Sequence, residues 1–350
     1  MRLGAALATA GVALALAACA QTDRIPSAFL NLATPQGVAL SDLPGWSEED
    51  HVAALRAVRA ACSVSHDPEM PFVCADLPAS PDERAARTWL ERNFLAVPLA
   101  GQGRLTGYFM PIYDAKRRRS EAFSAPVRPR PSDLPAADQT VGGRATYAQR
   151  AEIEERPASD ALAWMQPEDL FFMQVQGAGV LAFPDGDRAK AVFDGSNGAP
   201  FVGIAQPMRA QSLISDSASS ADAIHDWLLA HRGEEAKAIM DLDPRYVFYR
   251  LTVDDGQDPA GSVGVRLTPG RAAAVDPAYH SPGELLWIDA YAPTLAGAFP
   301  TYRRLVAALD AGGAIKGPVR ADLYVGRGET AGREAGRIRH VLTLYRLEPR

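Results

Sequence analysis

Apolar side chains recur at helical spacing in two stretches near the start of the chain. Val52, Leu55 and Val58 stand three residues apart within residues 47–58, behind a polar start that favours helix initiation. Residues 81–94 begin with Pro-Asp, another helix-start signal, and carry Trp, Leu and Phe further along. The pattern predicts two helices in this part of the chain.

After these helices the pattern changes to short apolar runs and turns. Residues 105–113 predict a strand, a kink and a second strand, and residues 169–204 predict further strands with a hairpin turn at 184–187. Longer helical patterns predict a helix at 144–168 and one amphipathic helix at 219–241.

From residue 244 to the end, apolar runs alternate with glycine-rich turns. Residues 246–251 and 285–288 are typical of strands because they combine apolar, aromatic and β-branched side chains. We predict a small barrel-like β domain after Asp243. The helix-and-strand region before it is a candidate insertion into that domain.

Composition narrows the class of protein. The chain has 350 residues, 47% of them hydrophobic, which is enough for at least one full core, and the length favours about two domains. Its net charge of −6 argues against binding to nucleic acid, because a phosphate-binding surface needs an excess of basic residues. No internal apolar run approaches the roughly 20 residues that span a bilayer.

The N-terminal segment is typical of an export signal. Residues 1–18 combine a basic start with an apolar run rich in Ala and Leu, and the run ends at Cys19, which resembles the lipidated cysteine of a bacterial lipobox. An ordinary cleaved signal followed by a chance cysteine is the alternative. Because Ala20 rather than Asp follows, we expect lipid anchoring at the periplasmic face of the outer membrane. Residues 19–45 are predicted to form a tether.

Export leaves Cys62 and Cys74 as the remaining cysteines. In an oxidising compartment an isolated pair is typical of a disulfide that closes a short loop. A zinc site needs more ligands, and the six His residues show no metal-type clustering. We therefore expect a disulfide, no metal and no other cofactor.

The densest chemical signal lies in residues 309–328. Asp310 and Asp322 flank a turn that contains three glycines and Lys316. Asp322 opens an apolar strand, where partial burial would raise its pKa towards the range that a general acid needs. Lys316 and Arg320 would lower that pKa if they lay close. The alternative is that both aspartates only cap turns, as Asp often does beside glycine.

Four segments carry a resemblance to a known family. They are Leu-Thr-Gly-Tyr-Phe-Met-Pro at 105–111, Met-Gln-Val-Gln-Gly-Ala-Gly at 173–179, Gly-Val-Arg-Leu-Thr-Pro-Gly-Arg-Ala-Ala-Ala-Val-Asp-Pro at 264–277, and Asp322 through Gly336. In this order they resemble motifs of the membrane-bound lytic murein transglycosylase A family, whose last part is called the 3D domain. Phe109 and Met110 depart from the family pattern, which has Tyr and then an acidic or polar residue there.

The resemblance implies a mainly β fold with peripheral helices. The family's fold is a double-psi β-barrel interrupted by a second, inserted β domain, with a groove for the glycan between them. On this chain the barrel domain would take residues 46–107 and 244–350, and the inserted domain would take residues 108–243.

The resemblance also implies a reaction. Members of the family use one acidic residue, which maps onto Asp322, to cleave the β-1,4 bond between N-acetylmuramic acid and N-acetylglucosamine in peptidoglycan. The 6-hydroxyl of the N-acetylmuramic acid is the nucleophile, so no second carboxylate or bound water is required. The product is a 1,6-anhydro end. Asp310 would support Asp322 or the glycine turn through hydrogen bonds.

Tyr108, Gln174, Gln176 and Lys316 are the candidate substrate-binding residues. An aromatic face suits a sugar ring, and amides suit hydroxyl or N-acetyl groups; packing within strands is the alternative for the first three. We expect a monomer whose partners are peptidoglycan glycan strands and, through Cys19, the membrane.

Two other functions fit the same features. One is a catalytically silent peptidoglycan-binding lipoprotein, which the departure at Met110 favours, whereas Asp310, Lys316 and Asp322 favour the enzyme. The other is a hydrolase that uses both aspartates, which requires a carboxyl separation of about 6.5–9.5 Å with room for a water.

Overall fold

The computed structural model describes residues 37–135, 147–215, 220–292 and 299–350. The predicted signal segment, the predicted lipidation site Cys19 and the first part of the predicted tether lie outside the described residues. None of the helices in the described ranges is long and apolar enough to cross a membrane.

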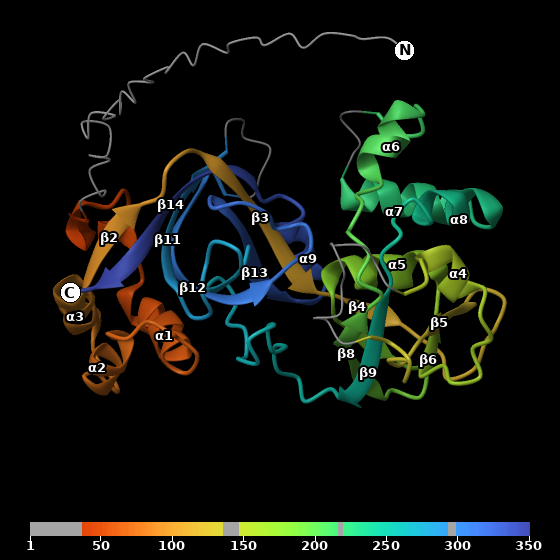
Figure 1. Cartoon of the computed structure of the whole chain (residues 1–350), viewed down its shortest axis with the longest axis horizontal. Helices are drawn as coiled ribbons and strands as arrows, with labels where there is room; N and C mark the ends of the chain where they lie inside the picture. Colours follow the sequence, from red (N-terminus) through yellow and green to blue (C-terminus); the bar gives the residue numbers. More distant parts are fainter. Residues whose placement is uncertain (1–36, 136–146, 216–219, 293–298) are drawn as a thin grey trace, which may run out of the picture. The chain divides into compact units, whose positions relative to one another are not determined.

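Six strands close on themselves to form a barrel (Figure 1). The strands are β3 (Gly103–Met110), β10 (Ala272–Val275), β11 (Leu285–Tyr291), β12 (Thr301–Ala311), β13 (Arg320–Arg327) and β14 (Arg339–Pro349). Their order is β14-β11-β12-β10-β13-β3, and β3 pairs back with β14. Two pairings, β10 with β12 and β3 with β13, are parallel, and the others are antiparallel. The predicted barrel after Asp243 is therefore confirmed, with β3 added from earlier in the chain.

Alternating residues of the six strands fill the barrel interior. Leu105, Ile288, Val306, Leu323 and Leu344 belong to one buried cluster. Because successive side chains of a strand point to opposite faces, the residues between them face outward. One face of β13 is thus committed to the core, and the other is available for packing or chemistry.

A helical layer packs against the outside of the barrel. It contains α1 (His51–Cys62), α2 (Met70–Ala75) and α3 (Glu83–Asn93), together with the short 3₁₀ turns Leu40–Asp42 and Trp46–Glu48. Leu55, Trp89 and Trp287 lie in the buried cluster that joins this layer to the barrel. Strand β2 (Phe94–Pro98) extends the sheet beyond β14, and β1 (Val38–Ala39) pairs with β2.

The two predicted N-terminal helices and the predicted disulfide are confirmed. The side chains of Asp50 and Asp82 accept hydrogen bonds from backbone N–H groups in the first turns of α1 and α3, as N-cap residues do. Cys62 ends α1 and is bonded to Cys74 in α2, with their Cα atoms 5.8 Å apart.

Between β3 and β10 the chain builds a second, four-stranded sheet. Its order is β4-β7-β8-β9, and a separate pair joins β5 to β6. The strands are β4 (Ile112–Asp114), β5 (Ala125–Val127), β6 (Ala163–Met165), β7 (Gly179–Ala182), β8 (Arg188–Ser196) and β9 (Val247–Val253). The predicted hairpin at 184–187 joins β7 to β8. The helices in this stretch are α4 (Arg150–Glu154), α5 (Pro167–Gln176), α6 (Ala205–Ala210), α7 (Ala221–Ala230) and α8 (Glu234–Met240).

The chain passes between the barrel and the four-stranded sheet at residues that differ from the predicted domain boundaries. β3 runs unbroken through residues 107–108, and β9 follows residue 243 but pairs with β8 in the four-stranded sheet. An apolar strand carries the same alternating pattern whichever sheet it joins, so the sequence did not distinguish the two.

Three predictions of local structure were wrong. Residues 171–177, predicted as a strand, lie in α5, which starts with Pro167 in its first turn and ends at Gly177 with a φ of 85°. Six of its ten residues are buried, and three of these are charged or polar, so the sequence shows no clear apolar stripe of helical period. The described part of the predicted helix at 144–168, from residue 147 on, contains the short α4, the strand β6 and the first two residues of α5. The predicted helix at 219–241 is two helices, α7 and α8, separated around Gly233, whose φ is 109°.

Candidate active site

Four neighbouring strands bring the two carboxylates of residues 309–328, Asp310 and Asp322, into one row. In β10, Ala274 pairs with Asp310 of β12 on one side and with Asp322 of β13 on the other, and Asp322 pairs with Thr106 of β3. Residues paired directly across strands project from the same face of a sheet, and strands lie about 4.8 Å apart. The backbones of Asp310 and Asp322 are therefore roughly 10 Å apart, with both side chains on the outer face.

A β-bulge in β12 places Asp310 in this row. Ala273 pairs with Ala308, but Ala274 pairs with Asp310, so Leu309 is an extra residue in β12. Ala308 points into the barrel, and without the bulge Asp310 would point inward as well. The bulge thus turns Asp310 to the face that carries Asp322.

Asp322 lies in a half-buried position with a defined donor. The Thr106 hydroxyl donates a hydrogen bond to its Oδ1 atom, and Arg320 Nη2 donates to the Thr106 hydroxyl oxygen at 2.9 Å. Burial raises the pKa of the Asp322 carboxyl above its ordinary value, and the charge of Asp310 acts in the same direction. The Thr106 hydrogen bond and the Arg320 charge oppose this shift without cancelling it. A carboxyl with a raised pKa is suited to donating a proton near neutral pH.

Asp310 is held by three donors. Its Oδ1 atom accepts hydrogen bonds from the backbone N–H groups of Ser262 and Ala311, each at 2.9 Å, and its Oδ2 atom accepts one from the Tyr108 hydroxyl at 2.8 Å. Burial raises the pKa of the Tyr108 phenol well above its ordinary value, and the nearby Asp310 charge adds to this shift. Tyr108 therefore stays a neutral donor, and its ring lies 5.3 Å from that of Tyr324.

The other predicted substrate residues are dispersed. Gln174 is only 5% exposed, and its side-chain carbonyl accepts a hydrogen bond from buried Arg150 at 2.6 Å, so this amide serves the packing beneath β9. Gln176 is half-buried in the last turn of α5 and approaches the backbone N–H of Phe109 at 3.5 Å. Gln176 thus lies beside β3, whereas Gln174 does not.

Lys316 lies close to the carboxylate of Asp276. Its Nζ atom lies 3.6 Å from Asp276 Oδ1, and its side chain is 65% exposed. Asp276 is a turn residue whose pKa is lowered first by the hydrogen bond from the Gly317 N–H, at 2.8 Å, and then by further donors and Lys316.

Sequence reasoning missed Thr106 as a site residue and treated Arg320 only as a nearby charge. Both belong to a ladder of three rungs on one face of β3 and β13: Arg104 with Arg320, Thr106 with Asp322, and Tyr108 with Tyr324. The signal was the two-residue spacing of polar and aromatic side chains along each strand. Only the parallel pairing of the two strands, which the sequence did not supply, puts them side by side. Met110 is buried in the core, which explains an apolar residue at that place.

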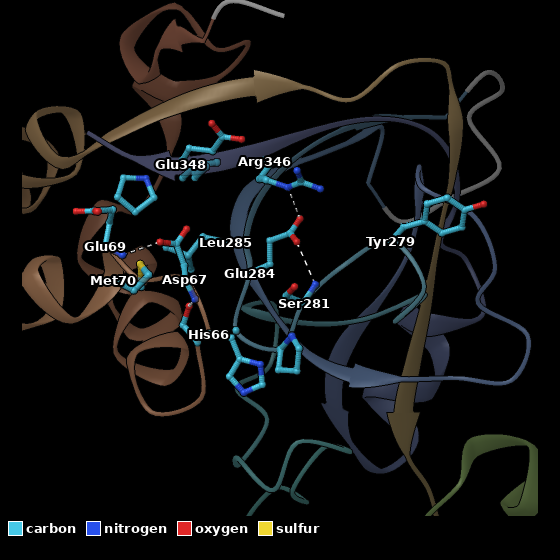
Figure 2. A pocket seen from close by; sticks show the side chains of 15 residues that line it. His66, Asp67, Glu69, Met70, Tyr279, Ser281, Glu284, Leu285, Arg346 and Glu348 are labelled. Atoms are coloured by element: carbon cyan, nitrogen blue, oxygen red, sulfur yellow. Dashed lines mark hydrogen bonds and ion pairs between the residues drawn. The ribbon is translucent and has the colours of Figure 1, made fainter. Parts of the chain in front are cut away.

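The surface cavities of the described residues include the following two. One, of about 550 Å³, adjoins the ladder and is lined by Arg104, Lys316 and Arg320 among others. The other, of about 580 Å³, lies between the disulfide-closed loop and the ends of β11 and β14 (Figure 2). There Glu284 accepts a hydrogen bond from Arg346 Nε at 2.9 Å. None of the residues of the carboxylate row lines this second cavity.

The part of the chain that the structure describes contains no group of three or more His, Cys, Asp or Glu side chains arranged to hold a metal ion.

Comparison with known proteins gives consistent matches. A family model described as the MltA specific insert domain matches residues 104–250, and one described as the 3D domain matches residues 271–348. Two curated relatives are named membrane-bound lytic murein transglycosylase A. The one from Vibrio cholerae is 28% identical over 249 residues, which cover 69% of this chain and 64% of the relative. The one from Escherichia coli K12 is 30% identical over 246 residues, with the same two coverages.

The fold gives a longer match. A crystal structure of the membrane-bound lytic murein transglycosylase from Agrobacterium tumefaciens has a TM-score of 0.77 and 27% sequence identity, covering 90% of this chain and 97% of that one. The matched part of the chain spans 64% of the length of the two curated relatives.

Proposed function

Because the chain belongs to the membrane-bound lytic murein transglycosylase A family, we propose that it cleaves the β-1,4 bond between N-acetylmuramic acid and N-acetylglucosamine in peptidoglycan without water. Asp322 is the proposed general acid and base. The observation that carries this proposal is the half-buried Asp322 carboxyl, whose pKa is raised, at the centre of the carboxylate row.

The reaction needs one proton donor that later becomes an acceptor. Asp322 gives its proton to the glycosidic oxygen as the bond breaks, and its carboxylate then takes the proton of the N-acetylmuramic acid 6-hydroxyl as that oxygen attacks the anomeric carbon. The attack is intramolecular and has a high effective concentration, so no enzyme nucleophile is required. The product carries a 1,6-anhydro ring, and the catalyst regains its proton.

Asp310 is proposed as a positioning residue. Its oxygens already accept three hydrogen bonds from the protein, which makes it poorly placed to activate a water. A hydrolase with two carboxylates requires such activation, so the contacts of Asp310 favour the single-acid reaction. Its charge also contributes to the raised pKa of Asp322.

Substrate contacts follow the ladder. The Tyr108 ring and the Gln176 amide are proposed to contact the glycan beside Asp322, and Lys316 is proposed to bind charged substituents of the glycan. Gln174 was expected at the substrate as well, but its contact with Arg150 favours a role in packing. The closed barrel with parallel pairings β10–β12 and β3–β13 supports the expected double-psi topology, and the four-stranded sheet between β3 and β10 supports an inserted domain.

The proposed location is the periplasmic face of the outer membrane, with a monomer anchored through a lipid on Cys19. This location rests on the signal-like sequence of residues 1–18 and on the membrane-bound relatives. Glycan strands of the wall are the proposed partner.

The test uses residues 20–350, expressed without the anchor, on intact sacculi. Released muropeptides are identified by mass spectrometry for the unaltered protein, for Asp322→Asn and for Asp160→Asn, a matched control at an exposed position. We expect anhydro ends, each lighter by one water than a hydrolysed end, from the first and third proteins only. Reducing ends would indicate a hydrolase. Binding to sacculi without release would indicate the catalytically silent lipoprotein.

A further inference from the structure

A cationic cavity lies at the end of the ladder next to Asp322. It has a volume of about 550 Å³ and is formed by the start of β3 and the turn that enters β13. Arg104, Lys316 and Arg320 line it, and no carboxylate is among its lining residues in the described part of the chain. This local excess of positive charge contrasts with the net charge of −6 of the whole chain.

The two arginines of the cavity form the first rung of the ladder. Arg104 and Arg320 are paired across β3 and β13, and Arg320 Nη1 donates to the Arg104 carbonyl oxygen at 3.4 Å. Burial lowers the pKa of the Arg320 guanidinium and the charge of Arg104 acts in the same direction, whereas the charge of Asp322 opposes this shift. Two like charges held side by side favour an anion between them.

The remaining lysine is available to the same cavity. Lys316 approaches Asp276, but at 3.6 Å, and most of its side chain is exposed. Asp276 is satisfied mainly by backbone donors, which include the N–H of Gly317. Lys316 can therefore turn to an incoming anion at little cost.

Two glycines shape the backbone around the cavity. A Cβ atom on Gly103 would lie 1.5 Å from the carbonyl oxygen of Val319, so only glycine lets the start of β3 approach the turn this closely. Gly317, with a φ of 105°, lets that turn fold back towards Asp276. The close approach of these two backbone segments therefore shapes one edge of the cavity.

The cavity is one step along the strand from the proposed acid. Arg320 and Asp322 are two residues apart on the same face of β13, about 7 Å along the strand. Arg320 also donates to Thr106, the residue that donates to Asp322. A group bound in the cavity therefore lies within the span of one sugar residue and its substituent from the cleaved bond.

We propose that this cavity binds a carboxylate of the peptide stem carried by the glycan strand that is being cleaved. The inference rests on the proposed function and names a further part of its substrate. In peptidoglycan the stem is attached to the lactyl group of N-acetylmuramic acid, and it contains free carboxylates. A guanidinium pairs with a carboxylate through two parallel hydrogen bonds, and Arg104 supplies such a group at the cavity wall. The site thus selects glycan that still carries its stems.

The test compares stem-bearing glycan strands with strands stripped of their stems by an amidase. For each protein the ratio of kcat/KM on the two substrates is measured, so that a general loss of activity cancels. We expect Arg104→Gln and Lys316→Gln to lower the ratio of stem-bearing to stem-free turnover roughly tenfold each, the usual size for one lost charge-assisted contact. Arg84→Gln, the same charge change at an exposed position of α3, should leave the ratio unaltered. An unaltered ratio in Arg104→Gln would overturn the proposal.

A binding measurement separates this inference from the proposed reaction. The probe is the tripeptide L-alanyl-D-glutamyl-diaminopimelate, titrated by calorimetry into the unaltered protein and into Arg104→Gln. Binding that is lost in the variant supports the stem site even where no glycan is cleaved. Binding retained in the variant, or equal binding of inorganic phosphate at the same concentration, would mean a general anion site or none and would overturn it.

Discussion

Replacing Thr106 with valine removes the hydroxyl that donates a hydrogen bond to Asp322 and keeps a branched side chain suited to the strand. The hydrogen bond stabilises the ionised form of Asp322 and so lowers its pKa, while burial raises it. Without the hydroxyl, burial acts with less opposition. The pKa of Asp322 should therefore rise further in Thr106→Val.

The size of the change follows from the type of contact. A hydrogen bond to a charged group contributes about 1.5–3 kcal/mol, and about 1.4 kcal/mol corresponds to one pH unit. If Asp322 must be protonated to act, activity is lost on the alkaline side as pH rises through its pKa. The alkaline limb of kcat/KM should then move upward by about 1 to 2 pH units.

The assay is a pH series of glycan turnover with Thr106→Val, with Thr106→Ser as the control that keeps a hydroxyl. Serine should leave the limb close to that of the unaltered protein. Arg320 complicates the valine variant, because it loses the oxygen to which Nη2 donates. If Arg320 turned to Asp322 directly, its charge would lower the pKa and the limb would move down. A downward shift, or none, would refute the assignment of Thr106 as the residue that tunes the acid.

Three further variants test the energetics of the site and its support. Asp322→Asn should raise the melting temperature at pH 7, because a carboxyl whose pKa is raised in the folded state destabilises that state once the pH exceeds its unfolded pKa. The gain should vanish below about pH 4, where the Asp322 carboxyl is neutral in both the folded and the unfolded protein. An equal gain at every pH would contradict this cause. Tyr108→Phe, which removes a donor to Asp310, should lower the free energy of unfolding by about 1.5–3 kcal/mol in urea titration; no loss would mean that the contact does not stabilise the fold. Replacing Cys62 and Cys74 together with serine should cost about 3 kcal/mol, and reduction of the unaltered protein should have the same effect, whereas a smaller effect would show a loop held by its packing alone.

The sequence predicted the barrel and the disulfide because these depend on local patterns, whereas Asp322 became the candidate acid through the resemblance of residues 322–336 to a family motif. Glycine-rich turns separate apolar runs after Asp243, and two cysteines remain once Cys19 is set aside. Asp322 stands at the start of an apolar strand, which is where a carboxyl becomes partly buried. Each of these features is written in a few adjacent residues.

The features that were missed depend on pairings between distant residues. α5 was predicted as a strand because its buried residues include Glu168, Asp169 and Gln174, whose partners lie elsewhere in the chain, so its apolar pattern has no helical period. The bulge at Leu309 leaves no trace in the hydrophobic pattern, and yet it decides that Asp310 faces Asp322. Thr106 and Asp322 are neighbours only because β3 and β13 are parallel, 216 residues apart in sequence.

A single carboxyl that must first give and then take a proton cannot have an extreme pKa. Burial alone would hold Asp322 protonated and make it a poor base, whereas direct contact with Arg320 would hold it ionised and make it a poor acid. The structure places the Thr106 hydroxyl between the two, so that Arg320 donates its hydrogen bond to Thr106, while its charge lowers the pKa of Asp322 through space. Arg320 also lines the cationic cavity, and a carboxylate bound there would offset part of its charge. If the proposed stem site and the proposed acid are both correct, occupation of the cavity would raise the pKa of Asp322 and favour its protonated form, and both functions would depend on the Arg320 guanidinium.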